Sequence, residues 1–104
     1  MIKHIVMWKL KDHAEGADKA TNVIKLKALL ETCRNIVPGL MKLEVGVANA
    51  TLEATYEATY DVVLYSEFTD KAALDAYQEH PTHQAIKPFI GAVRLERQCM
   101  DFEV

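Results

Sequence analysis

The sequence predicts an α+β domain whose elements follow the order β-α-β-β-α-β. Two observations carry this prediction. Four segments alternate apolar and polar residues at period two, as strands do, and two regions between them carry apolar residues at helical steps. The 104 residues suffice for one domain, which we expect to span residues 1–104. Half of the residues are hydrophobic and 26% are charged, a composition that excludes a disordered chain.

The first strand and the first helix are the clearest elements. Residues 2–10 alternate, with large apolar side chains on both faces of the strand. One face carries His4, Val6, Trp8 and Leu10, and the other carries Lys3, Ile5, Met7 and Lys9. A polar turn follows at 11–16. Helical spacing then runs from Asp18, the expected N-cap, to about Asn35, before the Pro-Gly pair at 38–39.

The next part of the chain predicts two further strands. Residues 41–47 alternate as a strand, and so does a segment that ends at Phe68. A loop at 48–57 joins them. The duplicated tetrapeptide at 53–60, EATYEATY, is too short to define a repeat architecture.

Prolines divide the helical region that follows. Thr69 or Asp70 caps its first helix, which ends near His80 because Pro81 disfavours helical geometry in the residue before it. The expected segments are a helix at 72–79, a short helix at 82–89 closed by Pro88 and Gly91, and a strand at 92–103.

This order of elements is that of the ferredoxin-like fold. Right-handed crossovers place the first and third strands in the centre of a four-stranded antiparallel sheet and the other two at its edges. The expected edge strands carry the charged residues Lys42, Glu44, Arg94 and Glu96. The helices cover one face only, so the other face, with Ile5 and Met7, would leave an apolar patch in water. We therefore expect a homodimer that packs sheet to sheet, a dimeric α/β barrel.

Charge and cysteine content exclude several classes of protein. The net charge is −3 and the sequence has no cluster of Lys or Arg, so we expect no nucleic-acid partner. Apolar runs are too short for a signal peptide or a membrane span, so we expect no membrane partner either. Cys33 and Cys99 lack the spacing of a redox or zinc motif, so we expect both to be reduced packing residues in a cytoplasmic protein.

Four segments carry a resemblance to a known family. They are IKHIVMWKLKD at 2–12, VPG at 37–39, YDVVLYSEF at 60–68 and AYQEHPTH at 76–83. Together they resemble the stress-responsive A/B barrel (Dabb) family over essentially the whole chain. The resemblance implies a dimeric α+β barrel. This family includes a plant polyketide cyclase that forms olivetolic acid by aldol condensation without a cofactor, which implies a cofactor-free cyclase or isomerase acting on an enolisable carbonyl compound.

The resemblance also implies site residues. The catalytic tyrosine and histidine of the cyclase fall on Tyr77 and His83, and its N-terminal pocket histidine falls on His4. Aromatic residues of the cyclase pocket correspond here to Leu26, Lys27 and Leu30, a departure that bears on the substrate. The residues expected to bind a substrate are His4, Val6, Trp8, Leu26, Leu30 and His80.

The positions of Tyr77 and His83 suit such chemistry. His83 lies two residues after Pro81, in the first turn of a helix whose positive end keeps an imidazole neutral and able to accept a proton. A nearby Tyr77 hydroxyl would stabilise an enolate oxygen while His83 removes an α-proton. In the structural alternative, Tyr77 anchors its helix in the core and His80 caps the helix end.

Other functions stay open at this point. A metal site from His4, His80 and His83 has no obvious carboxylate, and Pro81 breaks the helix between two of the histidines, so no metal or cofactor is expected. A non-enzymatic dimer could bind an apolar small molecule or serve a structural role under stress. A cofactor-independent monooxygenase of the same superfold would use an apolar pocket to activate an electron-rich phenol toward oxygen.

Overall fold

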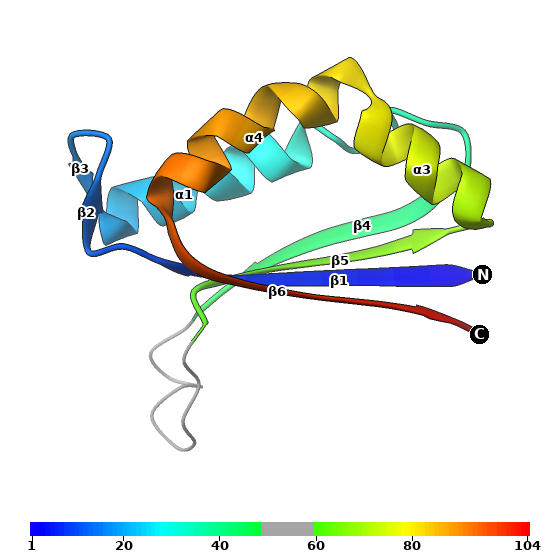
Figure 1. Cartoon of the computed structure of the whole chain (residues 1–104), viewed down its shortest axis with the longest axis horizontal. Helices are drawn as coiled ribbons and strands as arrows, with labels where there is room; N and C mark the ends of the chain where they lie inside the picture. The colour runs from blue at the N-terminus through cyan, green and yellow to red at the C-terminus, as the bar shows by residue number, and fades with distance from the viewer. Residues whose placement is uncertain (49–59) are drawn as a thin grey trace.

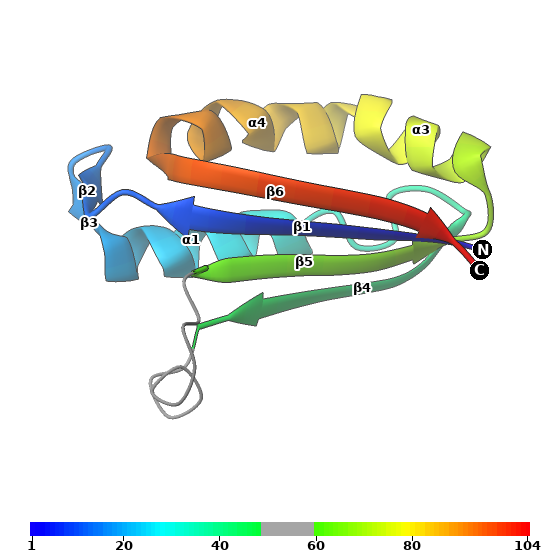
Figure 2. The same ribbon diagram turned by 60° about the horizontal axis from the view of Figure 1, so that its bottom comes forward.

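The computed structural model describes residues 1–48 and 60–104. The elements are β1 (Ile2–Leu10), β2 (His13–Ala14), β3 (Ala17–Asp18), α1 (Lys19–Glu31), β4 (Leu40–Val47), β5 (Val62–Phe68), α3 (Lys71–Glu79), α4 (Pro81–Val93) and β6 (Arg94–Glu103). The main sheet is antiparallel with the order β4-β5-β1-β6, and the three helices lie over one of its faces (Figures 1 and 2). The ferredoxin-like prediction is confirmed, with the first and third predicted strands, β1 and β5, in the centre.

Two local features differ from the sequence prediction. The turn at 11–16 contains the short β2–β3 hairpin, which Glu15 and Gly16 close with φ angles of 52° and 73°. Helix α1 ends at Glu31 rather than near Asn35, because the next N–H groups bond to carbonyls three residues back and Asn35 is left-handed, with φ 65°. The sequence duplication, apart from Tyr60, lies outside the described residues.

Helix α4 corrects the prediction of a short helix closed by Pro88 and Gly91. It continues through both residues to Val93, so β6 begins at Arg94 rather than at 92. Pro88 costs the helix one backbone hydrogen bond. The burial of Ile86 and Val93 in the core offsets this loss, and tertiary packing therefore outweighs the two local helix breakers.

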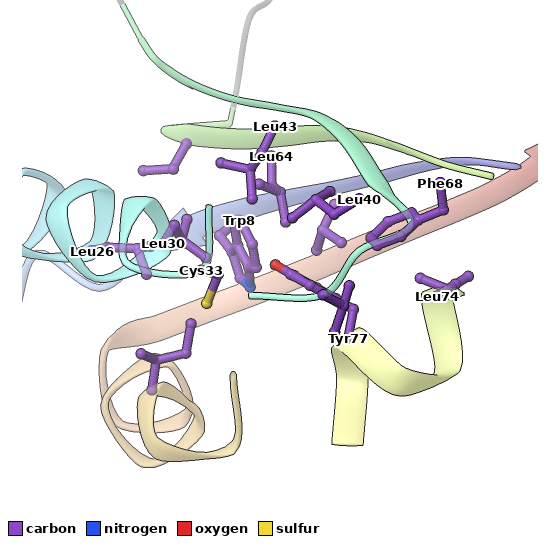
Figure 3. Packing of buried hydrophobic residues seen from close by; sticks show 14 of the residues in the cluster. Trp8, Leu26, Leu30, Cys33, Leu40, Leu43, Leu64, Phe68, Leu74 and Tyr77 are labelled. Atoms are coloured by element: carbon purple, nitrogen blue, oxygen red, sulfur yellow. The ribbon is translucent and has the colours of Figure 1, made fainter. Parts of the chain in front are cut away.

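The hydrophobic core lies between the sheet and the helices (Figure 3). Alternate residues of β1 and β5 point into it, and Trp8 is only 3% exposed, which confirms its predicted burial. Tyr77 and Phe68 are the largest fully buried side chains, and their ring centroids lie 5.1 Å apart. Asp70 caps α3, since its carboxylate accepts a hydrogen bond from the N–H of Ala73 at 2.9 Å.

None of the helices in residues 1–48 and 60–104 lies over the other face of the sheet (Figure 1). The strand registers place Ile5 and Met7 of β1 beside Val63 and Tyr65 of β5 and Met100 of β6 on this open face. Met100 is 63% exposed. Charged residues surround these apolar ones, with ion pairs between Lys9 and Glu96 and between Lys42 and Glu44.

Within residues 1–48 and 60–104, we found no helix that is both long enough and apolar enough to cross a membrane.

Candidate functional site

A pocket of about 380 Å³ lies between the sheet and α4. This volume falls in the range of small-molecule sites. Its floor is buried and consists of His4, Val6 and Trp8 of β1, Leu30 of α1 and Leu64 of β5. Gln78 of α3 and His83, Lys87, Ile90 and Gly91 of α4 form one wall, and Arg94 and Arg97 complete the lining.

His83 is the half-buried imidazole of this pocket. Burial lowers its pKa below the ordinary value, and the positive charge of Lys87 lowers it further, while the backbone of Gln78 acts in the opposite direction. The direction agrees with the sequence prediction, and burial and Lys87 are its largest causes. Its Nδ1 is buried and has no hydrogen-bond partner among the described residues. His83 is therefore neutral at pH 7 and has a nitrogen able to accept a proton.

Tyr77 lies behind His83 and does not line the pocket. Its ring centroid is 4.7 Å from that of His83, and its side chain is fully buried. Figure 3 shows the hydroxyl pointing to the part of the core where Trp8 and Cys33 lie. Burial raises the pKa of Tyr77, and the Cys33 thiol raises it further, so the phenol keeps its proton. Among the described residues its O–H has no hydrogen-bond partner.

The imidazole of His4 is held in place by Asp101 of β6. The β1–β6 register pairs the two residues, and His4 Nδ1 is in hydrogen-bond contact with a carboxylate oxygen of Asp101. A carboxylate in this position accepts a hydrogen bond from Nδ1–H, so Nε2 is the ring nitrogen without a proton. The sequence analysis missed Asp101, although the period of two along β6 puts it on the face of the sheet that bears His4.

Among the described residues, the group that could hold a metal ion consists of His4, Cys99 and Asp101. Their nitrogen, sulfur and oxygen atoms lie within 4.8 Å of one another. Ligands of one tetrahedral zinc ion lie roughly 3.3 Å or more apart. The His4 and Asp101 atoms are in direct hydrogen-bond contact, closer than that, so the group fits a histidine–carboxylate pair rather than a metal centre. Cys99 is exposed, with its sulfur 3.9 Å from His4 Nδ1, and is not the packing residue that the sequence suggested.

The other predicted residues divide into two groups. Val6, Trp8 and Leu30 line the pocket as expected. Trp8 contributes a buried indole Nε1–H that lacks a partner among the described residues. Leu26 belongs to the core instead, because it is fully buried beneath α1. His80 does not line the pocket either: it caps α4, with its Nδ1 accepting the N–H of Thr82 at 3.1 Å.

Three cationic pocket residues were not predicted. Lys87, Arg94 and Arg97 line the pocket, but they do not form a basic cluster in the sequence because none of them belongs to a run of basic residues. The helical spacing from His83 through Lys87 to Arg94 would have been the available signal, but the predicted end of the helix before Gly91 concealed it.

The geometry defines a ferredoxin-like α+β protein with a histidine-containing pocket between its sheet and its last helix. Residues 2–104 match the model of the stress responsive A/B barrel domain, and the chain belongs to this family. None of the curated proteins matches it.

Solved structures agree with this fold. A dimeric protein of unknown function from Jannaschia sp. CCS1 is 31% identical, with 99% of this chain and 98% of that chain covered and a TM-score of 0.73. A dimeric ferredoxin-like protein of unknown function from Bacteroides fragilis NCTC 9343 is 28% identical, with coverage of 99% and 95% and a TM-score of 0.80. An antibiotic biosynthesis monooxygenase is 18% identical, with coverage of 100% and 98% and a TM-score of 0.71, a likeness of fold alone.

Proposed function

We propose that this protein is a cofactor-free enzyme that moves protons on an enolisable carbonyl compound, as a cyclase or an isomerase. One observation carries the proposal: a neutral imidazole, His83, lines a pocket together with Trp8, whose buried Nε1–H has no partner among the described residues. Buried polar groups in native proteins nearly always have partners. An unpartnered donor beside a neutral imidazole supports a site that binds a polar, reacting group.

In the proposed step, His83 takes a proton from the carbon next to the substrate carbonyl. The C–H electron pair forms the enolate double bond, and the carbonyl π pair moves to oxygen. The Trp8 Nε1–H stabilises this oxygen, which is the role of an oxyanion-hole donor. An isomerase returns the proton from His83 to another carbon. A cyclase uses the enolate carbon to form a C–C bond to a second carbonyl, whose oxygen then takes the proton.

The assembly we propose is a homodimer through the open sheet face. The apolar side chains Ile5, Met7 and Val63 lie at the centre of that face and charged residues surround them, which is the usual composition of an interface. Similar structures are described as dimeric, which supports a homodimer, and the choice of the open face rests on its composition. The cytoplasmic location stays a prediction of the sequence.

Proton exchange provides the test. Phenylpyruvate and its methyl ester both have an apolar ring and an acidic C–H next to a carbonyl, so loss of the methylene NMR signal in D₂O reports proton removal. We expect the protein to accelerate exchange in at least one of them above the buffer rate. His83→Gln should lower the protein-dependent rate about 10²- to 10⁴-fold, the usual contribution of a general base.

His13→Gln is the matched control. His13 is exposed and lies in the β2–β3 hairpin, outside the pocket, so its variant should exchange protons at the wild-type rate. Equal rates for His83→Gln and wild type would refute the proposal. An oxygen-dependent consumption of an electron-rich phenol, abolished in the same variant, would favour the monooxygenase instead.

A further inference from the structure

We propose that the pocket selects an apolar carboxylic acid, whose carboxylate binds to Lys87, Arg94 and Arg97. This inference names the substrate class of the proposed enzyme and rests on the same pocket. It depends on charge at the pocket lining rather than on the reaction, so binding alone can test it.

The three cations come together through the geometry of α4 and β6. Lys87 follows His83 by four residues on the same face of α4, and Arg94 is the first residue of β6, directly after the helix ends at Val93. Arg97 reaches the pocket from β6, where it pairs with Trp8 of β1. All three residues are exposed, whereas the floor is buried. The cations therefore stand where the pocket meets solvent.

No acidic side chain faces these cations across the pocket. Among the residues that the structure describes, the pocket lining contains no Asp or Glu, and no carboxylate lies within ion-pair distance of Lys87, Arg94 or Arg97. Lys87 and Arg97 both lower the pKa of His83, so their charges act inside the pocket. Like charges near one another are unfavourable unless an anion separates them. In a chain of net charge −3, this local excess of positive charge indicates an anionic ligand.

The floor of the pocket indicates the rest of the ligand. Val6, Trp8, Leu30 and Leu64 form an apolar surface beneath the cations. A ligand that fills the pocket thus has an apolar body on the floor and its charge at the opening. Arginine binds a carboxylate through two parallel N–H···O bonds, which also fixes the orientation of the ligand. That orientation would bring the carbonyl of a keto acid to His83.

Equilibrium binding in the His83→Gln background, measured by calorimetry, tests the inference without turnover. The probes are phenylpyruvate, its methyl ester and inorganic phosphate. We expect phenylpyruvate to bind at least tenfold more tightly than the ester and than phosphate, and its affinity to fall as salt is added. Adding Arg97→Gln or Arg94→Gln should weaken phenylpyruvate binding about tenfold and leave the ester unchanged, since a charged hydrogen bond contributes about 1.5–3 kcal/mol.

Lys27→Gln is the control, because Lys27 is an exposed cation of α1 outside this pocket and should not change the affinity. Equal affinities for acid and ester, or an unchanged affinity in both arginine variants, would overturn the inference. Phosphate binding as tight as that of phenylpyruvate would also overturn it, since the apolar floor would then contribute nothing. In each of these cases the effect of His83→Gln on proton exchange would still decide the proposed reaction separately.

Discussion

The two faces of the sheet are both apolar at their centres, yet they differ in the polar groups that they carry. The helix-covered face places His4, Trp8 and His83 around a pocket, with Tyr77 packed behind His83, and has buried polar atoms that lack partners among the described residues. On the open face, polar side chains are paired at the rim, as in the 2.5 Å hydrogen bond from Tyr65 to Glu67. Unpartnered polar groups indicate ligand binding, whereas a paired rim around an apolar centre indicates association.

This comparison assigns different consequences to substitutions on the two faces. A change on the open face should alter assembly, and a change on the pocket face should alter chemistry. The following predictions separate these two consequences.

Met7→Asp on the open face should have the largest effect. It places an unpaired carboxylate in the centre of the proposed interface, at a cost of several kcal/mol. We expect light scattering at micromolar concentration to show that the wild type is a dimer and that the variant is a monomer or unfolded. Ile24→Asp, a control at a 72% exposed position of α1, should leave the dimer intact. A dimer that tolerates Met7→Asp would place the interface elsewhere.

Tyr77→Phe on the pocket face should separate activity from stability. The hydroxyl is buried behind His83 and does not line the pocket, so the variant should lower proton exchange far less than His83→Gln does. The variant should be as stable as wild type or about 1 kcal/mol more stable, because it removes a buried hydroxyl without a hydrogen-bond partner among the described residues. Urea unfolding measures the second effect. A clear loss of stability would show that the hydroxyl has a structural role, and a loss of exchange as large as that of His83→Gln would show that it acts on the substrate.

Gly91→Ala should have the smallest effect. A Cβ at this position meets no atom within 4 Å, and alanine favours a helix over glycine by about 1 kcal/mol, so the variant should be slightly more stable. Gly91→Leu should keep that stability and block the pocket, lowering phenylpyruvate binding. Gly39→Ala is the contrast, since its Cβ would lie 2.3 Å from that of Ala73 and should destabilise the fold. A loss of stability in Gly91→Ala would contradict the open space assigned to the pocket wall.

Hydrophobic periodicity was sufficient to predict the sheet, because β1 and β5 alternate strongly and their burial repeats that pattern. It was not sufficient for α4, because Pro88 and Gly91 predict a helix end. The helix nevertheless continues past both residues, since Ile86 and Val93 pack in the core. A local sequence pattern does not show whether the free energy of tertiary burial exceeds the cost of a lost backbone hydrogen bond.

The site shows the same limit. His4, Trp8 and His83 could be predicted as pocket residues, since strand alternation and the resemblance each point to them. Asp101 and Arg97 could not, because their places depend on the β1–β6 register, which joins residues more than 85 positions apart. The sequence has no basic cluster, and the cationic lining exists only after the chain has folded.

The pH dependence of proton exchange, compared between wild type and Lys87→Gln at substrate concentrations well below saturation, where the profile reports groups of the free enzyme, tests whether His83 is the base. Burial and Lys87 both lower the pKa of His83, so the wild-type rate should fall only as the pH drops below about 6.5, the ordinary value for histidine. Removing the Lys87 charge should raise the pKa and move the midpoint of the profile to higher pH. A midpoint that is identical in the two proteins would contradict the assignment of His83 as the proton acceptor.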